Sequence, residues 1–219
     1  NLEQPVLIKL ESQIEQLKGL LLEKNTIRNY IDGPTFAQVL GYMGRLNARE
    51  YSEKKDENYF ISDYLGKQGL EKYYEKALRG QPGLFETIKN ARGQKIKEGI
   101  KTQPESGQSL ILSLDADLQR KLQSKLSQVL LEINARKGVA IALDPSSGEI
   151  LALVSLPSFD NNLFSQGKDS EKIKKILQNP DQPLFNRAVA GLYASGSVIK
   201  PLIATAALQE KIISPEKQI

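Results

Sequence analysis

The sequence predicts an α+β fold in two parts, with helices and short antiparallel hairpins following one another along 219 residues. Apolar residues recur at helical spacing from Leu118 to Ile133, and two apolar runs, 139–143 and 150–154, flank a tight turn. A helix beside a hairpin needs a shared core, as in α+β proteins. The polar stretch 104–107 separates this region from an earlier, more mixed one.

The first part of the chain predicts a series of short elements. Apolar residues at helical spacing predict helices over 7–22 and 70–78, and Gly80 follows the second as a C-terminal stop. A weakly alternating stretch rich in Lys and Gly predicts an exposed hairpin over 88–100. The other predictions are a turn at 33–34, a short buried strand over 39–44 and a polar loop over 54–58.

The second part gives sharper patterns. A predicted strand over 109–114 leads to Asp115, a residue type that caps helix N-termini, ahead of the apolar stripe. The turn at 144–148 has proline for a fixed negative φ and glycine for a positive one. Because both flanking runs are apolar on both faces, they predict a buried central hairpin. A charged helix over 169–178 and an Ala-rich apolar helix over 201–208 complete this part.

The composition excludes several classes of function. The 30 basic and 26 acidic residues are mixed along the chain, and no basic stripe with interleaved aromatic residues indicates nucleic-acid binding. No apolar run reaches the ~18 residues that span a bilayer. Because histidine and cysteine are absent, a Ser-His-Asp relay, a Cys-His nucleophile and metal sites built from these residues are excluded. Lysine, carboxylate or tyrosine remains as a general base, and no cofactor is expected.

Ser197 and Lys200 are the candidate catalytic residues, within the Gly- and Ser-rich stretch 191–201. If Ser197 begins a helix, Lys200 lies one turn further along the same face, where its amine can reach the hydroxyl. A neutral lysine can take the proton of a serine, and apolar surroundings favour the neutral form. The backbone N–H of Ser197 at a helix N-terminus would form half of an oxyanion hole. The apolar residues nearby are Val198, Ile199, Leu202 and Ile203.

Two further features concern this pair. Pro201 disfavours helical geometry at Lys200, so an irregular first turn is expected. A second Ser-x-x-Lys, from Ser52 to Lys55, stands in a polar stretch and shows that the bare pattern arises by chance. The surrounding sequence therefore decides the interpretation.

That surrounding sequence resembles the class B penicillin-binding proteins, the bacterial D,D-transpeptidases that crosslink peptidoglycan. The stretch from Asn186-Arg187-Ala188 to Pro201 is similar to the family's "NRA…G.Y.pGS.fKP" segment. In that alignment Ser197 matches the acylated serine and Lys200 the lysine one turn later.

Other segments extend the resemblance. Residues 144–152 (DPSSGEILA) resemble the family's "D…tGeIlAm" strand-turn-strand core, and residues 155–160 (SLPSFD) follow as in the family. The segments 69–75 and 78–80, with Arg28-Asn29-Tyr30 ahead of 39–42, resemble the pedestal of the elongation-type enzymes.

The chain departs from the family pattern at a few points. Ala194-Ser195 replaces the residues usual before Gly196, and Ile199 stands where an aromatic often precedes the lysine; both reacting groups are retained. The family's Ser-x-Asn and Lys-Thr/Ser-Gly motifs, its membrane anchor and the Arg-Gly-rich start of its pedestal are not in this sequence. We therefore expect a fragment of a longer protein that is inactive alone.

The resemblance implies a pedestal domain over residues 1–106 and the N-terminal part of a transpeptidase domain over 107–219, with a central antiparallel sheet flanked by helices. It implies a wall-elongation transpeptidase that forms an acyl-enzyme and is a target of β-lactams. The implied substrates are peptidoglycan stem peptides. The implied partners, bound through the pedestal, are a membrane glycosyltransferase and a scaffold protein. The implied location is the periplasmic side of the inner membrane, held by an anchor.

Two alternative functions remain open. The pedestal would serve as an interaction module for wall-elongation proteins, which predicts partner binding without acylation. A serine β-lactamase or a β-lactam sensor shares the Ser-x-x-Lys pattern but generally lacks the long pedestal. Rapid hydrolysis of penicillin would favour this second alternative.

Overall fold

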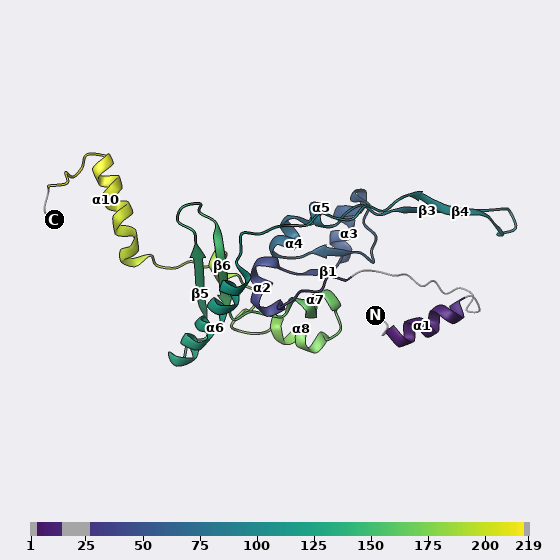
Figure 1. Cartoon of the computed structure of the whole chain (residues 1–219), viewed down its shortest axis with the longest axis horizontal. Coiled ribbons are helices and arrows are strands. Elements are labelled where there is room, and N and C mark those ends of the chain that lie inside the picture. Colours follow the sequence, from purple (N-terminus) through teal and green to yellow (C-terminus); the bar gives the residue numbers. More distant parts are fainter. Residues whose placement is uncertain (1–3, 15–26, 217–219) are drawn as a thin grey trace. The chain divides into compact units, whose positions relative to one another are not determined.

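Figure 1 shows the computed structural model of the chain, which describes residues 4–14 and 27–216. The chain divides into two compact units. One contains Asn1–Leu110 and Asp160–Lys174, and the other contains Ile111–Phe159 and Lys175–Ile219. The domain boundary between residues 106 and 107 stays a prediction. The segment Asp160–Lys174 lies in the first unit although it follows that boundary in the sequence.

The first unit consists of short helices and two separate antiparallel strand pairs. β1 pairs with β2, which aligns Met43 with Gly66, and β3 pairs with β4, which aligns Phe85 with Ile100. The elements of this unit are α1 (Gln4–Gln13), α2 (Gly33–Leu40), β1 (Met43–Arg45), α3 (Ala48–Lys54), η2 (Lys55–Glu57), β2 (Tyr64–Gly66), α4 (Gly69–Tyr73), α5 (Glu75–Leu78), β3 (Leu84–Lys89), β4 (Lys95–Thr102) and α7 (Asn161–Gln166).

The start and end of α2 correct two predictions. Pro34 lies in the first turn of this helix rather than in a separate turn, because its fixed φ suits a helix start. The predicted strand over 39–44 is wrong in its first half, since α2 continues to Leu40 and β1 begins at Met43. A short apolar run is compatible with either element, so its periodicity could not separate them.

Three other predictions for this unit are partly changed. The predicted helix over 7–22 is present as α1, and its part from residue 15 lies outside the described residues. The predicted loop over 54–58 contains the end of α3 and the turn η2. The predicted helix over 70–78 is interrupted at Tyr74 (φ −102°, ψ 21°), which separates α4 from α5. Gly80 follows α5 with φ +75°, as a C-terminal stop requires.

The turn after α2 packs directly against the start of α4. Gly41 has φ +76°, and a Cβ atom there would lie 1.8 Å from the carbonyl oxygen of Gln68. Gly69 has φ +60°, and a Cβ atom there would lie 2.5 Å from the carbonyl oxygen of Val39. Both positions therefore require glycine for conformation and for space.

The helix α7 is joined to the first unit by side chains that pair with main-chain groups. Asn162 Nδ2 donates to the carbonyl oxygen of Tyr30 at 2.9 Å, and the N–H of Tyr30 donates to Asn162 Oδ1 at the same distance. Asn161 is completely buried, and its Nδ2 donates to the carbonyl oxygen of Gly41 at 2.9 Å. A segment distant in sequence therefore satisfies the backbone around α2.

The predicted exposed hairpin is confirmed as β3 and β4, which extend from the other elements of their unit (Figure 1). Every residue of the two strands is exposed. An isolated two-stranded hairpin gains little from packing, as expected for this stretch rich in Lys and Gly.

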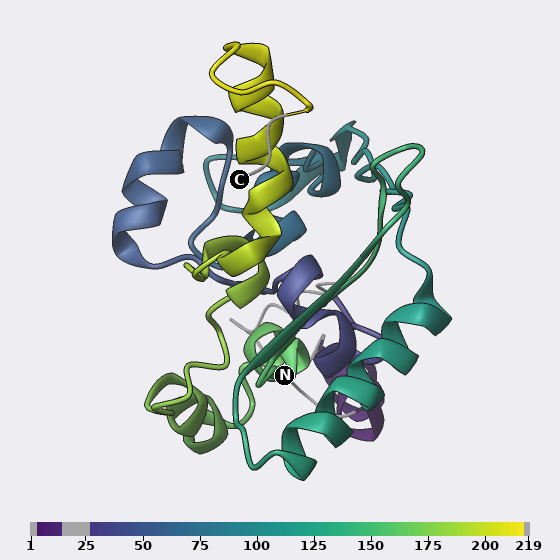
Figure 2. The same ribbon diagram turned by 90° about the vertical axis from the view of Figure 1, so that its left-hand side faces the viewer.

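The second unit is built on a helix and a hairpin, as predicted. Figure 2 shows α6 lying along the β5–β6 pair. Leu130 of the helix and Val154 and Leu156 of β6 form the buried cluster between them. The elements are α6 (Ala116–Glu132), β5 (Gly138–Leu143), β6 (Ile150–Leu156), α9 (Arg187–Ala190), η3 (Gly196–Ile199) and α10 (Lys200–Gln209), and α8 (Ser170–Leu177) crosses from the first unit to the second.

The predicted burial of the hairpin is confirmed for β6 and is wrong for part of β5. β6 is buried from Ala152 to Leu156, whereas Ile141 and Leu143 of β5 are 45% and 57% exposed. The predicted turn is confirmed, with Gly148 at φ +77° and its N–H donating to the carbonyl oxygen of Asp144 at 2.8 Å.

The predicted strand over 109–114 is wrong. This segment follows the outer edge of β6 through single hydrogen bonds rather than a ladder: Ser113 Oγ donates to Ile150 O, and the N–H of Asp115 donates to Leu151 O. Gln119 then continues along the edge with its side chain, pairing with both main-chain groups of Leu153. The edge is thus covered by a helix start rather than by a third strand.

Candidate functional site

Ser197 and Lys200 lie in consecutive elements. Ser197 is in the 3-10 turn η3, Lys200 is the first residue of α10, and the N–H of Lys200 donates to the carbonyl oxygen of Ser197. Residues three apart eclipse one another in a 3-10 turn, so the two side chains belong to one face. The hydrogen bonds of the described residues do not include one between these two side chains.

The irregular first turn expected from Pro201 is this 3-10 turn. Lys200 itself is helical, with φ −57° and ψ −42°, although it precedes a proline. Pro201 lies in the first turn of α10, where its missing N–H breaks no helical hydrogen bond. The tighter turn therefore accommodates the change of direction before the α-helix.

The apolar surroundings expected for Lys200 are not formed by the residues that the structure describes. Val198 is 86% exposed, Leu202 68% and Ile203 58%, and none of the residues of α10 is buried. The helix carries apolar residues over more than one face, so such burial would require neighbours on several sides.

The stretch before Ser197 is organised by Arg187. Its side chain is buried, and its guanidinium donates to the carbonyl oxygens of Gln182 at 3.1 Å and Phe185 at 3.2 Å and to that of Asp181. Asn186 caps α9 by accepting from the N–H of Ala188. In the motif Asn-Arg-Ala, the asparagine thus caps α9, the buried arginine binds the carbonyl oxygens of the preceding loop, and the alanine is a small residue inside the helix.

A cavity of about 480 Å³ lies beside this stretch in the second unit. Its wall includes Val139 of β5, Phe185, Arg187 and the exposed Leu192 and Tyr193. The cavity is therefore formed by the strand β5 and by the chain that leads to the 3-10 turn.

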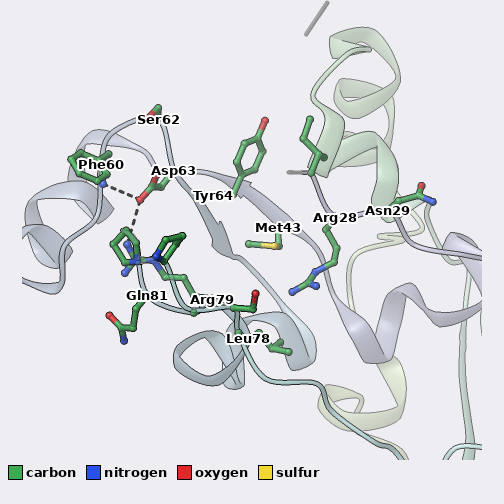
Figure 3. Close-up of a pocket in the computed structure, with 16 residues that line it drawn as sticks. Arg28, Asn29, Met43, Phe60, Ser62, Asp63, Tyr64, Leu78, Arg79 and Gln81 are labelled. Atoms are coloured by element: carbon green, nitrogen blue, oxygen red, sulfur yellow. Dashed lines mark hydrogen bonds and ion pairs between the residues drawn. The ribbon is translucent and has the colours of Figure 1, made fainter. Parts of the chain in front are cut away.

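The first unit has its own cavity of about 720 Å³, shown in Figure 3. Arg28, Met43 of β1, and Leu78 and Arg79 at the end of α5 line this region (Figure 3). It combines apolar side chains with two guanidinium groups, a composition suited to a peptide or a protein loop. The rest of its wall is formed by Ile27, Asn29, Phe60, Ser62, Asp63, Tyr64, Gly80, Gln81, Pro82, Pro104, Ser106 and Gly107.

Arg79 is held beside this cavity by a network of fixed partners. Its guanidinium donates to the carbonyl oxygens of Glu57 at 2.9 Å and Asn58 at 2.6 Å, and its Cζ lies 3.4 Å from the centre of the Tyr59 ring. Tyr59 donates its hydroxyl to the buried carboxylate of Glu75 at 2.9 Å. Burial, with this carboxylate, raises the pKa of Tyr59.

Arg28, on another wall, pairs through Nε with the buried carboxylate of Glu71 at 3.0 Å. Burial and the same carboxylate raise the pKa of Tyr30. The Arg28 side chain is 40% exposed, but its removal would leave the buried carboxylate of Glu71 without this partner, so we assign the contact a role in stabilising the first unit.

Two kinds of feature are absent from the described part of the chain. It contains no group of three or more acidic side chains that could hold a metal ion. None of its helices is long and apolar enough to cross a bilayer. The second Ser-x-x-Lys lies at the exposed end of α3, with Ser52 in the helix and Lys55 in η2.

Arg187, Ser155 and Gln119 were not predicted to have a role, although Arg187 and Ser155 lie in the stretches that resemble the family. The N–H of Arg187 donates to Ser155 Oγ at 3.0 Å, and Ser155 is 2% exposed. The available signal was an arginine between a capping asparagine and a small apolar run, a context that favours burial of the arginine. A buried arginine needs several fixed hydrogen-bond acceptors.

Comparison with known families and proteins gives matches over nearly the whole chain. Residues 1–112 match the Penicillin-binding Protein dimerisation domain, and residues 138–219 match the Penicillin binding protein transpeptidase domain. Peptidoglycan D,D-transpeptidase MrdA of Haemophilus influenzae is 39% identical over 197 residues, which are 88% of this chain and 29% of that protein. MrdA of Acinetobacter baumannii is 37% identical over 213 residues, which are 97% and 31%. The chain thus spans less than a third of the length of these curated relatives.

Solved structures also match this chain over nearly its whole length. The crystal structure of Pseudomonas aeruginosa PBP2 in complex with WCK 5153 matches with a TM-score of 0.72 and 32% identity, over 91% of this chain and 39% of that one. The complex between PBP2 and MreC from Helicobacter pylori matches with a TM-score of 0.78 and 27% identity, over 100% and 39%. A structure described as a peptidoglycan synthase complex matches with a TM-score of 0.75 and 34% identity, over 99% and 39%.

Proposed function

Because this chain belongs to the penicillin-binding proteins that join a dimerisation domain to a transpeptidase domain, we propose that it is part of an elongation-type peptidoglycan D,D-transpeptidase. The observation that carries this proposal is the position of Ser197 and Lys200 on one face of η3 and α10, inside the matched residues 138–219. The similarity to MrdA proteins supports it.

In the proposed reaction, Ser197 attacks the carbonyl carbon of the penultimate D-Ala of a stem peptide and forms an ester bond. Lys200 accepts the hydroxyl proton, and the C–N bond to the terminal D-Ala breaks as its nitrogen takes up that proton and the residue leaves as an amine. An amine of a second stem peptide then attacks the ester and forms the new amide bond, and its proton returns to the released serine. The N–H of Ser197 lies at the start of a helical segment, where it would stabilise the developing oxyanion. β-Lactams would acylate the same hydroxyl.

Acylation of the full-length protein with a fluorescent penicillin tests this proposal. The wild-type protein is expected to become labelled on Ser197, and Ser197→Ala is expected to lose the label. Ser52→Ala is the matched control, since it removes the serine of the other, exposed Ser-x-x-Lys and should label normally. Labelling retained in Ser197→Ala would refute the assignment, and rapid turnover of penicillin would favour a β-lactamase.

The first unit supports a second part of the proposal, the docking of wall-elongation partners. We propose that it binds a membrane glycosyltransferase and a scaffold protein, and that the whole protein acts at the periplasmic side of the inner membrane. The cavity of about 720 Å³ with two guanidinium groups favours such docking, and a solved relative is a complex of PBP2 with MreC.

Capture of partners by the full-length protein tests the docking role separately. Phe60 lies on the wall of this cavity and is 61% exposed, so Phe60→Ala should weaken partner capture without unfolding the unit. Penicillin labelling of Ser197 should be unchanged in this variant. If the wild-type protein captures neither a glycosyltransferase nor a scaffold protein, the docking role is refuted.

A further inference from the structure

We infer that Arg187 is a positioning residue for the acylation of Ser197, because its buried guanidinium and its N–H hold the loop before α9 and the start of α9 against β6, ahead of η3. This inference rests on the proposed transpeptidase function. It assigns a role to a side chain that lies outside the Ser-x-x-Lys pattern.

The guanidinium closes the loop before α9. Its two terminal nitrogens donate to three carbonyl oxygens, those of Asp181, Gln182 and Phe185, while the residue remains only 5% exposed. A planar guanidinium can satisfy several fixed acceptors at once, which a lysine ammonium on a flexible stem cannot do in the same geometry. The loop conformation therefore depends on an arginine at this position.

The main chain of Arg187 attaches the same residue to the sheet. Its N–H donates to Ser155 Oγ at 3.0 Å, and Ser155 is a buried residue of β6. The Ser155 hydroxyl in turn donates toward the carbonyl oxygen of Phe185 at 3.5 Å. Arg187 thus links the loop, the start of α9 and β6, and each link uses a different group of the residue.

The segment after Arg187 is held close to it. The N–H of Gly191 donates to the carbonyl oxygen of Arg187 at 3.2 Å. A Cβ atom on Gly191 would lie 2.4 Å from that oxygen and 2.6 Å from the ring of Tyr193, so the ring lies directly over the glycine. These contacts connect Arg187 to Gly191 and Tyr193, the latter four residues before Ser197.

The hydrogen bonds of Arg187 are separate from the buried cluster of Leu130, Val154 and Leu156, which holds α6 to the hairpin. Loss of the guanidinium should therefore alter the path toward Ser197 more than the core of the unit. Misplacement of a nucleophile by about 1 Å can lower a rate by about 100-fold. Since Arg187 acts at some distance from the hydroxyl, we expect a smaller effect, on the order of tenfold.

The test measures the acylation of the full-length protein by a fluorescent penicillin at a series of concentrations. This separates the limiting acylation rate constant from the dissociation constant of the non-covalent complex. The variants are Arg187→Ala, Arg187→Lys and Ser155→Ala. The matched control is Arg136→Ala, because Arg136 is 79% exposed and reaches the same loop only through a 3.8 Å ion pair with the Asp181 carboxylate.

We expect Arg187→Ala to lower the acylation rate constant on the order of tenfold, with the dissociation constant changed less than about twofold. Arg187→Lys should not restore the rate, Ser155→Ala should lower it less, and Arg136→Ala should match the wild type. If Arg187→Ala does not fold, Arg187→Lys and Ser155→Ala decide in the same way. An unchanged rate constant, or an effect confined to the dissociation constant, overturns the inference while the proposed function stands. Absence of Ser197 labelling in the wild type refutes the proposed function instead.

Discussion

Gln119 provides the sharpest stability prediction, because one side chain satisfies two main-chain groups. It is completely buried; its Nε2 donates to the carbonyl oxygen of Leu153 and its Oε1 accepts from the N–H of Leu153, both at 2.8 Å. Gln119→Leu preserves size and helix propensity but leaves both buried groups unpaired, at about 1–3 kcal/mol each. The greater hydrophobicity of leucine offsets part of this, so we expect a net loss of about 2–4 kcal/mol in the unfolding free energy of the second unit.

Hydrogen exchange at the Leu153 amide of the full-length protein measures this loss where it occurs. A loss of about 2–4 kcal/mol corresponds to a protection factor lower by roughly 30- to 1000-fold. Gln128→Leu is the matched control, because Gln128 is exposed on the same helix. Equal exchange rates at Leu153 in the two variants would refute the assigned role of the Gln119 amide.

Three further predictions concern turns and the docking of α7. Gly41→Ala should cost more than about 3 kcal/mol, whereas Gly93→Ala, also at positive φ (+78°) but in open space, should cost about 1 kcal/mol; equal melting temperatures would contradict the clash. Asn162→Ala should cost about 2–4 kcal/mol by thermal unfolding, since two hydrogen bonds to one residue's main chain are lost, and a loss below 0.5 kcal/mol would count against that pairing. The hydroxyl and the N–H of Ser146 hold the pKa of Asp144 below its ordinary 3.8, so the stabilisation is present above 3.8 and is lost as pH falls through the lower, folded-state pKa. Ser146→Ala should raise that pKa toward 3.8 in an NMR titration; an unchanged value would contradict the cause assigned here.

The sequence predicted those elements whose signals are local. The cap of α6 is confirmed in detail, since Asp115 Oδ1 accepts from the N–H groups of Asp117 and Leu118 at 2.9 Å. The pairing of β5 with β6 and the turn between them are confirmed, because the two apolar runs and the proline and glycine of the turn favour the same structure. The resemblance to the penicillin-binding proteins is confirmed at the level of the family.

Features that depend on distant partners could not be predicted in this way. The segment over 109–114 has the composition of a strand, yet a helix start and a glutamine side chain occupy the edge of β6. Asn162 meets Tyr30 across 132 residues, and no local pattern indicates that pairing. Arg187 belongs to the same class, since its acceptors are carbonyl oxygens whose direction only the folded loop determines.

The alignment of Ser197 with Lys200 depends on the type of helical turn between them. A spacing of three residues is imperfect in an α-helix, where neighbours three or four apart diverge around the axis, but it is the repeat of a 3-10 turn. Pro201 has no N–H to donate to the carbonyl oxygen of Ser197, as an α-helical turn at this point would require, and that oxygen instead accepts from the N–H of Lys200 in a 3-10 turn. Pro201 therefore favours the geometry that aligns Lys200 with Ser197. This makes a further test available: Pro201→Ala should extend the α-helix toward Ser197, rotate the two side chains apart and lower the acylation rate constant, whereas an unchanged rate constant would show that the 3-10 turn is not required.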